Sequence, residues 1–380
     1  MHEFSAQYGS CLLGTPSESF KYDMDIGVAG AWALHLTVVL ILIGALAIIL
    51  LSCEVFTNGV EWLGLRLGLA ETATGSVLAA VGTAMPETIV PLIAIFMGTE
   101  IQGEEIGEGA ILGAPFMLGT LAMFIGGLAV LYGYRKGKRK PYLKLRRDHA
   151  ERDMKFFMLA YSLALLTGLI GLNEDFRVGY INTGVAMVLL VAYGYYIHKT
   201  VQDEEIEKNN SCPDLYVCKF CEIDPAKGKY GLTLILLQVL AALIGIIVGA
   251  KLFVTEVEEV SLAIGVSPMV VSFLIAPIAT ELPEKFNSVV WYLRSKDTLG
   301  FGNVTGAMVF QSCIPVSIGL LFTSWVLEPK NIVSIVIALA SSAWLFFAIR
   351  HNNGISYKVM LASGSLYLVY VVFLFLFELG

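Results

Sequence analysis

Long runs of apolar residues recur along the whole chain and alternate with short polar segments. A run of about 20 apolar residues is long enough to cross a bilayer as a helix. The pattern predicts an all-α polytopic membrane protein with ten transmembrane helices. The expected helices span residues 33–65, 69–98, 107–133, 154–172, 177–198, 231–257, 265–293, 299–326, 331–350 and 355–378.

The polar segments at the start and in the middle divide the chain into four parts. Residues 1–32 are expected to form an extracellular or periplasmic N-terminal segment, and residues 199–230 a polar connector on the cytoplasmic side. Two five-helix repeats then span residues 33–198 and 231–380. Composition agrees with a membrane protein, because 56% of the 380 residues are hydrophobic and only 15% are charged. No basic patch with interleaved aromatic residues argues for nucleic acid as a partner.

The charges of the loops predict the orientation of the chain. Residues 134–153 form the most basic segment, so the positive-inside rule places this loop in the cytoplasm. Counting helices from this loop places the N-terminus outside the cell and the connector in the cytoplasm. The protein itself is expected in the cell (inner) membrane. The acidic segments 99–108 and 256–259 then both fall outside. Because each half has an odd number of helices, the two repeats are expected to be inverted relative to each other.

One polar motif occurs in each half, within an otherwise apolar stretch. Residues 81–87 have the sequence VGTAMPE and residues 278–284 have the sequence IATELPE, so Glu87 aligns with Glu284 and Thr83 with Thr280. An ionisable group at membrane depth costs at least roughly 2.5 to 3.5 kcal/mol, so it is expected to face a polar cavity. Two such motifs in inverted halves predict a transporter whose site lies at the repeat interface, near the midplane.

The motif residues suit a hard cation. Two carboxylates at the midplane repel each other unless they share protons or a cation. Ca2+ prefers oxygen ligands, which Glu87 and Glu284 supply together with charge. The prolines of the motifs, Pro86 and Pro283, are expected to interrupt helices and to free backbone carbonyls one turn earlier. The further candidate oxygen ligands are the hydroxyls of Thr83 and Thr280 and the carbonyls around Gly82 and Ala279.

Structural roles remain open for these groups. The two glutamates could be hydrogen-bonded within the helix bundle, and each threonine hydroxyl could bond to its own helix. The polar connector raises a separate question, because Cys-x-x-Cys is half of a zinc-type spacing. A regulatory Zn2+ site and reduced thiols in a flexible loop are both compatible with its cysteines, Cys212, Cys218 and Cys221.

The paired motifs resemble the alpha repeats of the cation/calcium exchanger superfamily, which includes sodium/calcium and proton/calcium exchangers. The second motif is followed by Gly302 to Gln311, GNVTGAMVFQ, which strengthens the resemblance. It covers both repeats, about half of the chain. It implies that Glu87 and Glu284 are the central Ca2+ ligands, with Thr83 and Thr280 beside them and Asn303 as a supporting ligand. It also implies alternating access through one shared site.

Several residues depart from the pattern of that superfamily. Ala110 stands where the first repeat usually has a polar side chain, Glu281 replaces a small or hydroxyl residue, and Lys285 follows Glu284 directly. The second repeat keeps polar groups at Gln311 and Ser312, which are candidate modulators of the ion site together with Glu281 and Lys285. These departures leave the ion ratio and the counter-ion open.

The expected function is a secondary antiporter that exchanges Ca2+ for Na+ without a cofactor. Its partners are Ca2+, Na+ or H+, and the lipid bilayer. The alternative is exchange of Ca2+ or another divalent cation for H+, with the glutamates as proton carriers. A cation channel is a further alternative, although inverted repeats favour alternating access. An enzyme is not expected, because the spans contain no Ser-Lys, His-Glu-x-x-His or Asp-rich constellation.

Overall fold

The structure of the protein is a computed structural model, which describes residues 18–66, 85–99, 102–171, 179–203, 215–216, 231–352 and 354–378. The helices of the first half are α1 (Glu18–Arg66), α3 (Met85–Met97), α4 (Gln102–Met117), the π-helix η2 (Leu118–Ala122), α5 (Met123–Arg135), α6 (Arg147–Gly171) and α7 (Gly179–Asp203). The helices of the second half are α9 (Gly231–Ile264), α10 (Pro268–Leu293), α11 (Asp297–Phe322), α12 (Pro329–Asn352) and α13 (Tyr357–Glu378). Two short strands, β1 (Tyr142–Leu143) and β2 (Ile355–Ser356), pair antiparallel.

The chain has an all-helical polytopic membrane fold. Within the described residues, eight helical segments are long and apolar enough to cross a membrane: Thr37–Val60, Gln102–Arg135, Arg147–Gly171, Gly179–Thr200, Gly231–Leu262, Asp297–Phe322, Pro329–His351 and Tyr357–Leu374. Two shorter apolar helices, Pro86–Met97 and Pro268–Ile278, lie in the two stretches that carry the Pro-Glu motifs. The count of ten spans stays a prediction, since residues 67–84 lie outside the described part of the chain.

Some helices extend beyond the membrane spans that the apolar pattern predicts, for a common reason. Helix α1 begins at Glu18 and α6 at Arg147, both earlier than the apolar pattern predicts. Apolar runs mark the part of a helix within the membrane, whereas a helix can continue into water through polar residues. In α6 the first turns carry an (i, i+4) ion pair between Arg147 and Glu151, at 2.6 Å, which supports this extension.

The expected interruption of the second motif helix was wrong. Helix α10 runs without a break from Pro268 to Leu293, past Pro277 and Pro283. Ser267 caps it, since the side chain of Ser267 accepts a hydrogen bond from the Val270 amide. Neighbouring helices pack around a proline in the membrane and can compensate for a missing backbone bond.

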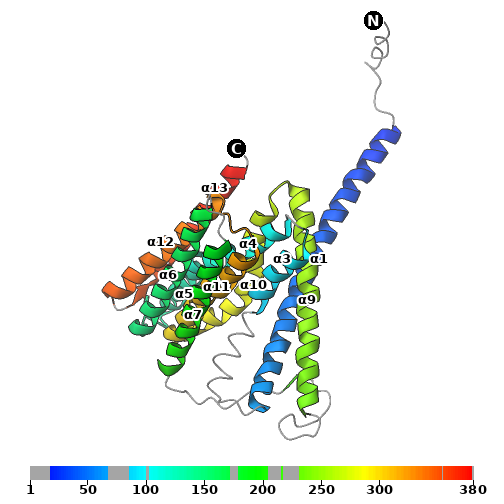
Figure 1. Cartoon of the computed structure of the whole chain (residues 1–380). Coiled ribbons are helices and arrows are strands. Elements are labelled where there is room, and N and C mark those ends of the chain that lie inside the picture. The colour runs from blue at the N-terminus through cyan, green and yellow to red at the C-terminus, as the bar shows by residue number, and fades with distance from the viewer. Residues whose placement is uncertain are drawn as a thin grey trace.

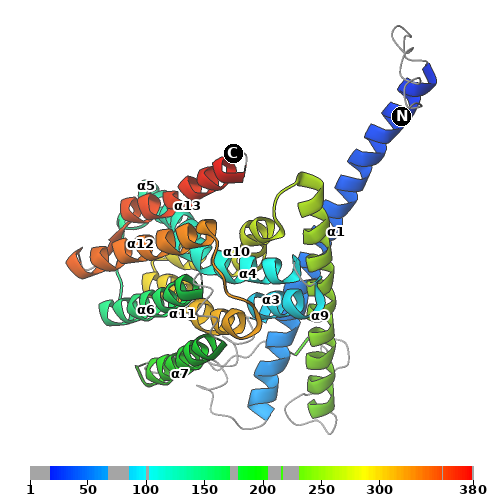
Figure 2. The ribbon, with the colours of Figure 1, turned by 45° about the horizontal axis from the view of Figure 1, so that its top comes forward.

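Helices of the two halves pack against one another. The long helices α1 and α9 run side by side at one edge of the molecule (Figures 1 and 2). Gln238 of α9 donates hydrogen bonds to the Asn58 side chain and the Val55 carbonyl of α1, both at 3.0 Å. In the same way α4 packs on α10, α5 on α13, and α6 and α7 on α11. The helices of the two halves therefore pack among one another and do not form two separate bundles.

Three loops meet at one end of the bundle. Arg139, in the loop between α5 and α6, forms a buried ion pair with Asp297 at the start of α11, at 2.9 Å. Strand β1 of the same loop pairs with β2, between α12 and α13. At the opposite end Thr323 donates a hydrogen bond to Glu108 at 2.8 Å. The loops that the charge pattern assigns to one side thus lie together; which side faces the cytoplasm stays a prediction.

Candidate functional site

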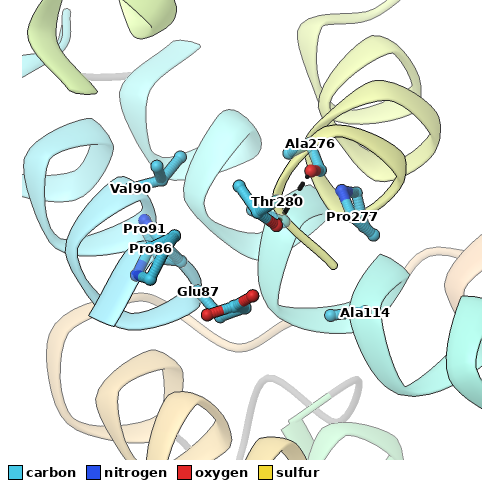
Figure 3. Close-up of a pocket in the computed structure, with 9 residues that line it drawn as sticks. Pro86, Glu87, Val90, Pro91, Ala114, Ala276, Pro277 and Thr280 are labelled. Atoms are coloured by element: carbon cyan, nitrogen blue, oxygen red, sulfur yellow. Dashed lines mark hydrogen bonds between the residues drawn. The ribbon is translucent and has the colours of Figure 1, made fainter. Parts of the chain in front are cut away.

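A small cavity lies between α3, α4 and α10 (Figure 3). It has room for the centre of a water-sized particle, about 10 Å³, which fits about one water molecule or one cation. Among the described residues that line it, the polar side chains are a glutamate and a threonine, and the others are apolar. The residues that line it are Pro86, Glu87, Val90, Pro91, Ala110, Ala114, Ala276, Pro277 and Thr280.

Glycines of α4 bring the two motif helices close together. A Cβ atom at Gly107 would lie 2.6 Å from Ile95 of α3. On another face of α4, a Cβ atom at Gly113 would collide with the carbonyl of Phe273 and would lie 2.9 Å from Pro277, both on α10. Such close approach requires glycine. Helix α4 therefore packs closely against both α3 and α10, and the cavity lies where the three helices meet.

The carboxylate of Glu87 supplies the charge of the cavity. Its side chain is only 7% exposed and points between Thr280 and Ala114 (Figure 3). Pro91, one turn later in α3, also lines the cavity and has no N–H for the Glu87 carbonyl. Carboxylate oxygens are hard ligands of the kind that Ca2+ prefers. Glu87 therefore brings both negative charge and ligand atoms to the cavity.

The hydroxyl of Thr280 faces the same cavity from α10. It donates a hydrogen bond to the Ala276 carbonyl at 3.0 Å, so the bonding to its own helix that was left open is present. This bond uses the hydroxyl proton and not the two lone pairs of the oxygen. The oxygen atom of Thr280 can therefore still act as a ligand for a cation in the cavity.

Ala110 and Ala114 of α4 form the third wall of the cavity. The position of residue 110 therefore faces the cavity, as the resemblance to the alpha repeats implies. Alanine offers no side-chain oxygen there. The first half thus contributes one charged group, Glu87, and no further polar side chain from its described residues that line this cavity.

Several predicted site residues are not described. Thr83 and Gly82 lie outside the described residues. The backbone of α10 includes Ala279, Glu284 and Lys285, but their side chains also lie outside the described part of the structure. The meeting of Glu284 with Glu87 therefore stays a prediction.

Two predicted residues of α11, Asn303 and Gln311, contact α10 and are not among the described residues that line the cavity. Asn303 donates a hydrogen bond from Nδ2 to the hydroxyl of Ser288, at 2.9 Å. Gln311 donates one from Nε2 to the carboxylate of Glu281, which is 1% exposed. Ser312 donates to the Val309 carbonyl of its own helix at 3.0 Å.

Sequence reasoning missed Ser288. It follows Glu284 by four residues, so it lies one turn further along the same face of α10. That spacing is the signal that could have identified it. Asn303, the proposed supporting ligand, contacts Ser288 and therefore lies about one helical turn along α10 from Glu284.

The zinc hypothesis finds no support. Cys212, Cys218 and Cys221 lie outside the described residues. Among the residues that the structure describes, no group of three or more His, Cys, Asp or Glu side chains could hold a metal ion.

Comparison with known proteins extends over most of the chain. A family model described as sodium/calcium exchanger protein matches residues 37–199 and 234–376. The chain is 23% identical over 295 residues to an uncharacterized membrane protein of Methanocaldococcus jannaschii, which covers 77% of this chain and 84% of that protein. It is 22% identical over 314 residues to CaxA of Alkalimonas amylolytica, which is named as an antiporter, with coverage of 82% and 89%.

Solved structures share the fold. The H+/Ca2+ exchanger CAX superposes with a TM-score of 0.68 at 17% identity, covering 93% of this chain and 88% of that chain. The sodium-calcium exchanger NCX_Mj superposes with a TM-score of 0.51 at 20% identity, covering 88% and 97%. At these identities the likeness concerns the fold alone.

Proposed function

This chain belongs to the sodium/calcium exchanger protein family, and we propose that it is a secondary antiporter that moves Ca2+ in exchange for Na+. Proteins of this family are exchangers and not enzymes. The observation that carries the proposal is the buried carboxylate of Glu87, which shares a cavity of one-cation size with the Thr280 hydroxyl.

We propose that Glu87 and Glu284 together balance the charge of one Ca2+ ion. The hydroxyls of Thr280 and Thr83 complete the ligand set, with Asn303 in support, since Ca2+ takes six to eight oxygen ligands. Na+ would occupy overlapping oxygens when Ca2+ has left, so that the two ions compete for one site.

Alternating access requires the cavity to open toward each membrane face in turn. Rocking of one intact repeat against the other would separate α1 from α9 and α4 from α10, which pack closely. We therefore propose that smaller units move. The α1–α9 pair at the edge of the molecule contacts both motif helices, α3 and α10, and is suited to expose or cover them.

The membrane arrangement is part of the proposal. It comprises ten spans in two inverted repeats, an N-terminus outside the cell membrane, and a cytoplasmic face that holds the Arg139 loop. The basic charge of residues 134–153 supports this orientation.

A second candidate function is exchange of Ca2+ for H+, and Ala110 favours it. Each Na+ ion needs several oxygen ligands of its own, and residue 110 supplies none although it lines the cavity. A proton needs only a carboxylate, which Glu87 offers.

The two functions are separated by Ca2+ uptake into proteoliposomes. One set is loaded with Na+ and diluted into Na+-free medium; the other carries a proton gradient and no Na+. Uptake driven by the Na+ gradient supports the first proposal, and uptake driven only by the proton gradient replaces it with the second. Absence of uptake in both sets, with the protein correctly inserted, would refute Ca2+ exchange.

A further inference from the structure

A buried carboxylate outside the cavity connects three helices. Asp153 of α6 is 5% exposed. Its Oδ1 atom accepts a hydrogen bond from the hydroxyl of Tyr196 on α7, at 3.0 Å. Its Oδ2 atom accepts one from the hydroxyl of Thr305 on α11, at 2.7 Å. Both carboxylate oxygens are therefore used within the helix bundle.

A positively charged side chain lies beside the Asp153 carboxylate, which still accepts both hydroxyl hydrogen bonds. The Arg152 side chain approaches Asp153 at 3.6 Å and lies over the ring of Tyr196, 5.6 Å from its centroid. Apolar side chains would fill this space at a lower cost in desolvation. Asp153 lies in the first two turns of α6, and burying its charge there has a cost that packing alone does not require, which suggests a role beyond packing.

The partner on α11 is close to a proposed ligand. Thr305 is 1% exposed and follows Asn303 by two residues. At 3.6 residues per turn, these two side chains lie about 200° apart around the helix. Thr305 therefore faces α6 and α7, whereas Asn303 faces α10, where it contacts Ser288.

Helix α11 is thus hydrogen-bonded on two opposite sides. We propose that Asp153 and Thr305 are positioning residues, which fix the rotation of α11 so that Asn303 keeps its contact with Ser288, about one helical turn along α10 from Glu284 of the proposed cation site. This inference rests on the proposed function of that site. A rotation of about 20° would move a side-chain atom by about 2 Å, given a helix radius of about 5 to 6 Å. Binding sites tolerate errors of only about 0.5 Å.

The inference predicts a specific effect on cation affinity. Thr305→Val keeps the shape of the side chain and removes the bond to Asp153, whereas Thr305→Ser keeps the hydroxyl. Thr305→Val is expected to raise the KM for Ca2+ about fivefold, the effect of one hydrogen bond, with little change in maximal rate. Thr305→Ser is expected to behave as the unsubstituted protein.

Thr167→Val is the matched control. Thr167 is also buried, 3% exposed, but its hydroxyl donates only to the Leu163 carbonyl of its own helix, at 2.8 Å. This variant is expected to leave the KM unchanged. Equal effects of Thr305→Val and Thr167→Val would mean that only general packing matters, and would overturn the inference.

A double-mutant cycle tests whether Thr305 acts through Asn303. In an Asn303→Ala background, Thr305→Val is expected to cause no further rise in KM. A full, additive effect there would overturn the inference even if Thr305→Val alone raises the KM.

A second measurement does not depend on transport. In the full chain carrying Asn303→Cys and Ser288→Cys, the two cysteines are expected to form a disulfide under mild oxidation, and Thr305→Val is expected to slow this reaction. If the unsubstituted protein transports no Ca2+, the proposed function fails while this result still decides the positioning role. Equal rates of disulfide formation with and without Thr305→Val would contradict it.

Discussion

Two buried residues, Glu87 of α3 and Thr280 of α10, line one cavity, although they belong to opposite halves of the chain. The sequence repeat aligns Thr280 with Thr83, not with Glu87. The fold thus combines the glutamate of one motif with the threonine of the other, as expected for a site at a repeat interface. In the proposed site, each half alone would supply an incomplete ligand set.

Replacement of the Thr280 hydroxyl tests this combination. Thr280→Val keeps the side-chain shape and removes an oxygen ligand, so the KM for Ca2+ is expected to rise about fivefold. Thr280→Ser keeps the oxygen and is expected to remain near the unsubstituted value. Uptake measured over a range of Ca2+ concentrations distinguishes the two. Equal kinetics for the Val and Ser variants would exclude Thr280 as a ligand.

The contact of α4 with α10 depends on Gly113. In Gly113→Ala the added methyl group would collide with the Phe273 carbonyl and approach Pro277, so α10 must shift. Such overpacking costs about 1 to 3 kcal/mol, and the displaced Thr280 is expected to lower Ca2+ affinity as well. Thermal unfolding in detergent and uptake assays measure the two effects.

Gly194→Ala is the control for that substitution. Gly194 lies in α7, and a Cβ atom there would meet nothing within 4 Å. The control is expected to leave unfolding temperature and uptake unchanged or to stabilise the helix slightly. If Gly113→Ala behaved in the same way, the close packing of α4 on α10 would be refuted.

The ion pair between Arg139 and Asp297 is expected to stabilise the loop end of the bundle. Both side chains are nearly buried, and Asp297 also accepts a hydrogen bond from the Lys144 amide at 2.8 Å. Asp297→Asn removes the charge that pairs with a buried guanidinium, which costs up to about 3 to 5 kcal/mol in such pairs. The hydrogen bonds from Arg139 to the Tyr292 and Tyr142 carbonyls remain. The unfolding temperature is expected to fall clearly.

The exposed pair of Arg147 and Glu151 offers the comparison. The Arg147 side chain is 45% exposed, and pairs of this kind contribute about 0.3 to 0.5 kcal/mol. Arg147→Gln is therefore expected to change the unfolding temperature very little. A larger fall in unfolding temperature for Arg147→Gln than for Asp297→Asn would contradict the conclusion that the buried pair is the more stabilising contact.

The sequence pattern predicted much of this architecture for clear physical reasons. Apolar runs mark membrane helices, and the repeated motif identified Glu87 and Thr280 before their shared cavity was known. Both depend on composition and spacing along the chain, which a sequence carries directly. The place of Ala110 in the cavity wall was implied only by the resemblance to the alpha repeats.

Partners of buried polar groups could not be predicted in this way. Asp153 was expected in a loop, and its bond to Thr305 depends on how α6 packs on α11. The contact of Asn303 with Ser288 likewise depends on the rotation of two helices. Helix packing angles and rotations are set by many small contacts together, so a linear pattern does not determine them.

The central claim is that the Glu87 carboxylate binds the transported Ca2+, and charge removal tests it most directly. The measurement is Ca2+ uptake by Glu87→Gln beside Glu108→Gln, a control at a buried carboxylate that contacts Thr323 and does not line the cavity. We expect Glu87→Gln to lose at least about tenfold in uptake, because ligand charge sets Ca2+ affinity, and Glu108→Gln to stay within about twofold. Normal uptake by Glu87→Gln, or equal losses in both variants, would contradict the account.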